Sequence, residues 1–185
     1  MAGDAARGCG SSGSSSVHQK RMLIHDQIRT AELFDGLSAD GIQRLAAIGR
    51  ALTLRSGEYL FLLGDTAQYV SVVTSGLVDL CCPISFGGVV KDITVESVGP
   101  GKTVGWSALV KPFRFTLSAR AARASEVIAF ARPELLQVFA DDPQIERVVV
   151  SGVSELMANR LTMFQALWMR ELLRAFSPGG QGATA

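Results

Sequence analysis

Charge of either sign is scarce in this sequence, and the two signs nearly cancel. Charged residues make up 19% of the 185 residues, with 18 Lys and Arg against 17 Asp and Glu, for a net charge of +1. Such a chain has no overall field to attract nucleic acid or an anionic membrane surface. The sequence therefore weighs against a dedicated DNA-binding protein. Hydrophobic residues reach 48%, which is typical of a folded domain with a well-buried core.

Long hydrophobic runs are also missing. The longest apolar stretches are interrupted by Gly64, Asp65 and Asp79, so none reaches the roughly 18 residues of a membrane-spanning helix. The first residues, MAGDAARGCGSSGSSS, contain no apolar segment of the kind that a secretory signal requires. We therefore expect a cytoplasmic protein without membrane attachment.

Metal-ligating and catalytic residue types are few. The three cysteines, Cys9, Cys81 and Cys82, show no CxxC spacing, and the two histidines are His18 and His25. Neighbours on a strand point to opposite faces, so Cys81 and Cys82 are poorly placed to chelate one metal, and an iron–sulfur cluster needs about four thiolates. No Ser-His-Asp, Cys-His or HExxH arrangement is present. We expect no metal site and no enzymatic activity, with haem ligation by His25 as an alternative.

The periodicity of apolar residues divides the chain into four segments. Residues 1–20 form a Gly/Ser-rich tail that cannot bury enough surface to become ordered, and residues 177–185 form a second tail. Residues 21–142 start with helical patterns and then alternate with period two between frequent turn signals. Residues 143–176 return to a helical period. This order predicts a mainly β fold with flanking helices, namely a β-roll followed by a long C-terminal helix.

Local signals place several elements within this plan. Ser38 is expected to cap a helix whose apolar face contains Leu45, Ala46 and Ile48. The stretch RPELLQVFADDP is expected to form a short helix with Pro133 in its first turn. The strands are separated by turns that contain glycine: Ser56-Gly57, Gly64-Asp65 and Ser75-Gly76.

The long helix carries two adjacent apolar stripes. One contains Val150, Val153, Met157, Leu161, Phe164, Trp168 and Leu172, and the other contains Ile145, Val149, Leu156, Met163 and Leu167. Two stripes need two partners, which we expect to be the parent domain and the same helix of a second copy. The alternative is a helix wholly packed on its own roll. At 1.5 Å per residue the helix is about 50 Å long, however, and a small domain cannot cover it.

Several motifs in this order resemble the cyclic nucleotide-binding domain, especially that of the Crp/Fnr regulators. They are LFDGLS, SGEYLFLLGDTAQYVSVVTSGLVDL, VGPGKTVGWSAL and the closing ELMANRL, and the similarity covers about residues 30–175. The resemblance implies a β-roll that binds a cyclic nucleotide through a phosphate-binding cassette. In the family, the N–H groups of a short helix and an arginine hold the phosphate, and a glutamate binds the ribose.

The cassette departs from the family pattern at both polar anchors. By its resemblance to the family, it comprises Val104, Gly105, Trp106, Ser107, Ala108 and Leu109, followed by Arg114, Phe115 and Thr116 at the start of the next strand. Trp106 stands at the glutamate position and Phe115 at the arginine position. We expect the two rings to fill the emptied pocket. Arg114 is one residue away, so a bulge or a loop shift would be needed for it to replace the missing arginine.

These observations predict a freestanding regulatory or sensor domain with lost or altered affinity for cyclic nucleotide. Another small phosphorylated ligand is an alternative, as is a ligand-free module that dimerises and binds a protein. A haem or redox sensor ranks third. The Crp/Fnr regulators carry a helix-turn-helix after the long helix, whereas here SPGGQGATA follows Phe176. We therefore expect no specific DNA binding.

Overall fold

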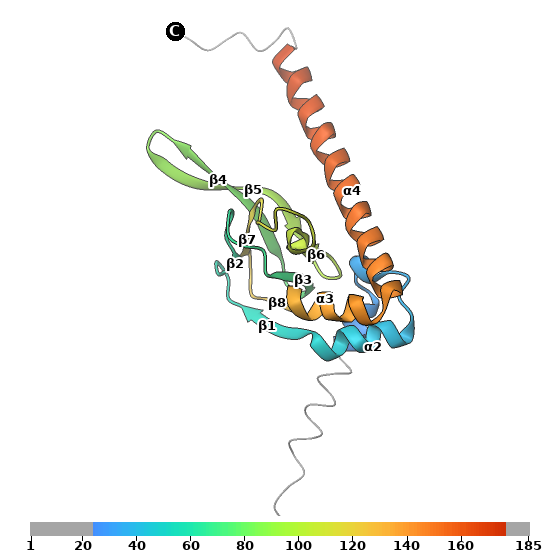
Figure 1. The fold of residues 1–185 in the computed structure, drawn as a ribbon. Helices are drawn as coiled ribbons and strands as arrows, with labels where there is room; N and C mark the ends of the chain where they lie inside the picture. Colours follow the sequence, from blue (N-terminus) through green and yellow to red (C-terminus); the bar gives the residue numbers. More distant parts are fainter. Residues whose placement is uncertain (1–23, 177–185) are drawn as a thin grey trace, which may run out of the picture.

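The computed structural model describes residues 24–176 (Figure 1). The tails expected at 1–20 and 177–185 lie outside the described residues, as do Cys9 and His18. A helical segment over residues 24–29 comes first. The other helices are the 3₁₀ helix η1 (Glu32–Phe34), α2 (Ala39–Ile48), the 3₁₀ helix η2 (Trp106–Leu109), α3 (Arg132–Asp141) and α4 (Pro143–Phe176).

The strands of the described chain form a roll of two antiparallel four-stranded sheets. One sheet has the order β1-β8-β3-β6, and the other has the order β2-β7-β4-β5. The bounds are β1 (Arg50–Leu54), β2 (Tyr59–Phe61), β3 (Tyr69–Ser75), β4 (Val78–Phe86), β5 (Val89–Val98), β6 (Thr103–Val104), β7 (Ser118–Ala121) and β8 (Ser125–Ala131). The expected β-roll with flanking helices and a long C-terminal helix is confirmed.

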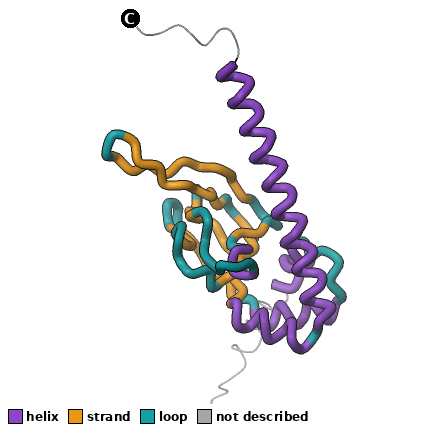
Figure 2. The backbone as a smooth tube through the Cα atoms, turned by 45° about the horizontal axis from the view of Figure 1, so that its top comes forward, coloured by secondary structure: helices purple, strands orange, loops and turns teal. Residues whose placement is uncertain are grey.

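Alternation along β8 divides the buried residues between two cores. Ile128 and Phe130 face the helices, where the rings of Phe34 and Phe130 meet edge to face with centroids 5.2 Å apart. Val127 faces the other way, into the space between the sheets, together with Val73. Figure 2 shows the helices gathered at one side of the strands. The first sheet therefore separates a helix-side core from the interior of the roll.

The expected local signals for the helices are confirmed. The N–H of Gly41 donates a 3.1 Å hydrogen bond to the hydroxyl oxygen of Ser38, which caps α2. Leu45 and Ala46 of that helix are buried in the helix-side core. Pro133 lies in the first turn of α3. No helix within residues 24–176 has the length and apolar character needed to cross a bilayer.

Cys81 and Cys82 point to opposite sides of β4, as expected. The side chain of Cys81 is buried, whereas that of Cys82 is partly exposed. Burial raises the pKa of the Cys81 thiol, because the charged thiolate would lose its hydration. Cys81 therefore serves as a small neutral core residue.

Helix α4 is anchored at its N-terminal end and projects past the roll at its C-terminal end (Figure 1). Ile145 and Val149 are buried in the helix-side core, and so is Val153, which is only 5% exposed. The expectation that Val153 belongs to a stripe left free for a partner is therefore wrong. Its position in the helix turns it toward the parent domain, where the chain itself covers it.

Gly152 allows α4 to approach η1 closely. A Cβ atom at this position would lie 2.7 Å from the carbonyl oxygen of Leu33, which is backbone and has little freedom to move. We expect Gly152→Ala to lower the free energy of unfolding by about 1–3 kcal/mol, as measured by denaturant titration. The matched control is Gly41→Ala, whose Cβ would meet side-chain atoms at 3.4 Å. Equal stability of the two variants would contradict this reading of the helix contact.

Candidate functional site

The short helix of the cassette is preceded by a glycine that two constraints require. Gly105 has φ 78° and ψ 20°, in the left-handed region that favours glycine. A Cβ there would also lie 2.8 Å from the carbonyl oxygen of Tyr69. The next four residues form the single 3₁₀ turn η2, in which Ser107 and Ala108 are buried. Val104, just before the turn, is also buried, and Leu109 packs against the helix-side core.

Two stacked phenylalanines occupy the space beside Gly105. The rings of Phe61 and Phe115 have centroids 3.7 Å apart and planes inclined by 9°. A Cβ on Gly105 would lie 3.3 Å from a ring carbon of each. Phe115 thus lies against the turn that holds phosphate in the family that the sequence resembles. Its partner Phe61 comes from β2, which is far from Phe115 in the sequence.

Helix α4 covers Trp106 with an arginine. The guanidinium carbon of Arg160 lies 5.7 Å from the centroid of the Trp106 ring, within the range of a cation–π contact. The Nη2 atom of Arg160 lies 2.8 Å from Oε2 of Glu96 on β5, and the Arg160 side chain is 18% exposed. Glu96 therefore balances the positive charge that α4 brings to the cassette.

Arg114 is held away from the cassette. Its Nη1 donates a 2.7 Å hydrogen bond to the carbonyl oxygen of Gly64, and its backbone pairs with Thr66 in an isolated bridge. Arg114 is exposed and does not border the void at the cassette, whereas the exposed Thr116 does. The bulge that would bring Arg114 to the phosphate position is therefore absent from this region of the structure.

The void left at the cassette is small. It has a volume of about 20 Å³ and is bordered by η2, the phenylalanine pair and Arg160. Such a void has room for about one water molecule, whereas ligand pockets usually measure about 300–1,000 Å³. A cyclic nucleotide would have to displace the aromatic side chains before it could enter.

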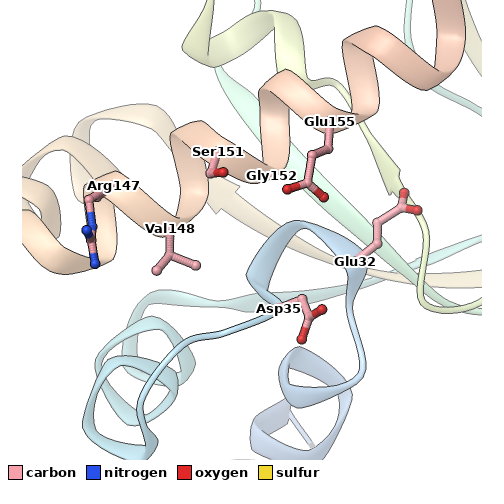
Figure 3. A pocket seen from close by; sticks show the side chains of 7 residues that line it. All are labelled: Glu32, Asp35, Arg147, Val148, Ser151, Gly152 and Glu155. Carbon is pink, nitrogen blue, oxygen red and sulfur yellow. The ribbon is translucent and has the colours of Figure 1, made fainter.

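A larger hollow of about 350 Å³ lies between η1 and α4 (Figure 3). Figure 3 shows Asp35 and Glu155 on its two sides, with the carboxylate of Glu32 turned toward the neighbouring strand. That carboxylate accepts hydrogen bonds from Nζ of Lys102 at 2.7 Å and from the N–H of Thr103 at 2.9 Å. The hydrogen bond and the charge of Glu32 raise the pKa of Lys102. Glu32 thus links η1 to β6 through hydrogen bonds.

The described residues offer little else for metal or acid–base chemistry. Within residues 24–176, no three His, Cys, Asp or Glu side chains are close enough together to hold a metal ion. Nδ1 of His25 lies 3.6 Å from a carboxylate oxygen of Asp26, its neighbour in the chain.

Apolar side chains remain uncovered along the free part of α4. Trp168 is 68% exposed and Leu161 is 59% exposed. The exposed members of the stripe proposed from the sequence are Val150, Met157, Leu161, Phe164 and Trp168. We call these five residues the α4 stripe.

Sequence reasoning missed three residues of the site. Phe61 lies in LFLL and Arg160 in ELMANRL, both within motifs that resemble the family, and Glu96 is a strand residue. Nothing in their spacing connects them to the cassette, because they come from β2, α4 and β5.

Comparison with known proteins agrees with this fold. The model of the cyclic nucleotide-binding domain matches residues 51–142, which include the cassette. No curated protein matches the chain. Among solved structures, a cyclic nucleotide-binding domain from Methylobacillus flagellatus is similar, with 19% identity over 90% of this chain and 88% of that chain, and a TM-score of 0.64.

Two further structures are similar over part of their length. The catabolite activator protein of Thermus thermophilus has 26% identity over 78% of this chain and 63% of its own, with a TM-score of 0.60. The regulatory domain of Toxoplasma gondii PKA, crystallised with cAMP, has 16% identity over 76% of this chain and 52% of its own, with a TM-score of 0.65. Through residues 51–142 and the roll that they form, this chain belongs to the cyclic nucleotide-binding domain family.

Proposed function

We propose that this chain is a regulatory module whose cassette no longer binds a cyclic nucleotide and which acts through a dimer formed by α4. The main support for the loss of cyclic nucleotide binding is the stacked pair Phe61–Phe115, which lies against Gly105. The rings occupy the place where the phosphate would enter, and they bring no hydrogen-bond donor to it. The similar proteins from Thermus thermophilus and Toxoplasma gondii are an activator and a regulatory domain, which supports a regulatory role over a catalytic one.

The missing anchors have a predictable effect on affinity. A phosphate without its bidentate guanidinium loses a charge-assisted hydrogen bond of about 1.5–3 kcal/mol. A ribose hydroxyl that faces the indole of Trp106 loses a second bond. Together these losses weaken binding on the order of a hundredfold or more. Arg160 is a poor substitute, because Glu96 already pairs with it and would repel the phosphate.

The α4 stripe supports the second half of the proposal. Its members lie on a side of the helix next to the one that is buried against the parent domain. A second copy of α4 packed on this stripe would remove several large apolar side chains from water. An interaction module that needs no ligand would use the same surface, so ligand titration distinguishes that function from a sensor.

Direct titration tests the cassette. We expect cyclic AMP and cyclic GMP to bind the purified protein with dissociation constants above about 100 µM in calorimetry, if they bind at all. A thermal-shift panel that includes other phosphorylated metabolites serves as the broader measurement. Low-micromolar binding of cyclic AMP would overturn the proposal. Arg114→Ala would then test whether that arginine leaves Gly64 to hold the phosphate.

A further inference from the structure

A cavity that opens to solvent at one end of the roll lies on the other side of the Phe61–Phe115 pair from the cassette. Both rings border the 20 Å³ void at the cassette and also a cavity of about 380 Å³. This cavity is lined by residues of both sheets and lies beside β1 and β2, each of which is the edge strand of its sheet. The pair therefore acts as a partition inside the roll.

Strand register explains why this end of the roll is hollow. Val127 pairs with Leu52 and with Val73, and two residues further along β8, Ala129 pairs with Ser71. All of these side chains face the interior. Leu52, Val127 and Val73 form a row of larger side chains across the sheet, and the next row contains the small residues Ala129 and Ser71. Leu52 is 43% exposed although it faces the interior, so the roll is open to solvent at this end.

The residues that line the cavity indicate which kind of ligand it can bind. It is mainly apolar, with Leu52, Leu60, Phe61, Phe115 and Ala129 among its residues. The polar side chains that join them are Asp65, Thr66, Gln68, Tyr69 and Ser71, so the lining includes a carboxylate and no Lys, Arg or His. A carboxylate without a balancing cation repels anions. A phosphorylated ligand is thus disfavoured here.

One hydroxyl that lines the cavity has no partner within the described residues. Ser71 faces the interior and is 1% exposed as a residue, and its hydroxyl forms no side-chain hydrogen bond with another described residue. Its oxygen is not among the buried side-chain atoms that lack a partner, so it is accessible from the cavity and free to hydrogen-bond with a molecule bound there. The volume is within the usual range for small-molecule sites, about 300–1,000 Å³.

We infer that this cavity binds a small uncharged apolar molecule, such as an aromatic amine, whose polar group hydrogen-bonds with Ser71. The site is separate from the cassette, and it binds uncharged apolar ligands, whereas the cassette of the family binds a phosphate. This inference therefore does not rest on the loss of cyclic nucleotide binding, and a titration with cyclic AMP does not test it.

The neutral fluorescent probe N-phenylnaphthylamine tests the inference. We expect one saturable site per chain, with affinity at least about tenfold higher than that of the anionic anilinonaphthalene sulfonate. Ala129→Leu, which fills the cavity, should weaken binding of the neutral probe by about tenfold or more. The matched control is Ala51→Leu, the same change at an exposed position on β1 that pairs with Ile128 and faces away from the cavity.

Heteronuclear NMR of the wild-type protein provides a readout that does not depend on the variants folding. Titration with the neutral probe should shift the amide signals of Ser71, Ala129 and Leu52 most strongly. Shifts confined to α4 would place the probe on the exposed stripe and overturn the inference. The absence of saturable binding, or equal binding by Ala129→Leu and wild type, would overturn it as well.

Discussion

The double variant Trp106→Glu, Phe115→Arg is expected to bind cyclic AMP at least about tenfold more tightly than wild type. Phe115 lies against Gly105, so an arginine there would bring its guanidinium to the N–H groups of η2. The glutamate would supply the missing acceptor for the ribose. Calorimetry with cyclic AMP measures the gain. The neighbouring Arg160 limits it, because that guanidinium lies over position 106 and can pair with the new carboxylate.

The matched control opens the same space without adding the polar groups. Trp106→Ala, Phe115→Ala should leave cyclic AMP binding as weak as in wild type. Both variants lose the stack on Phe61, and the loss of a buried phenylalanine typically costs about 3–5 kcal/mol of stability. Circular dichroism and thermal melting must therefore confirm folding first. Equal affinities of a folded Glu/Arg variant and the folded Ala/Ala control would contradict the assignment of these two positions as the lost anchors.

Leu161→Asp with Phe164→Asp is expected to convert a dimer into a soluble monomer. In a symmetric pair of α4 helices, the two changes would bury four uncompensated carboxylates, each at a cost of several kcal/mol. The dimer dissociation constant should rise by at least about a thousandfold. Sedimentation equilibrium over a range of concentrations measures this change. The fold should be retained, because both residues are exposed within one chain.

A control with the same added charge separates the interface from a general effect on the helix. Thr162→Asp with Ala166→Asp places two carboxylates on an exposed face of α4 that points away from the α4 stripe. This variant should remain dimeric. A wild-type protein that sediments as a monomer at about 100 µM would refute the α4 dimer, whatever the variants do.

The fold was predictable because its signals are local. The period of two across the strands, the glycine turns and the cap at Ser38 each act within a few residues, and the structure reproduces them. The length of α4 and the burial of Ile145 and Val149 also followed from periodicity. Val153 was misassigned, because adjacent stripes on one helix differ by a small rotation. Which of them faces the domain depends on how the helix docks on η1.

Periodicity and motif order therefore suffice to place the roll, the terminal helix and the short turn that follows Gly105. Long-range packing decides the rest. Phe61 stacks on Phe115 and Arg160 covers Trp106 only because β2 and α4 are brought to the cassette by the folded chain. The cavity beside Ser71 is another such feature, since it arises where small residues on β3 and β8 come into register opposite β2. Local patterns specify which face a side chain takes, whereas the space in front of it depends on residues far away in the sequence.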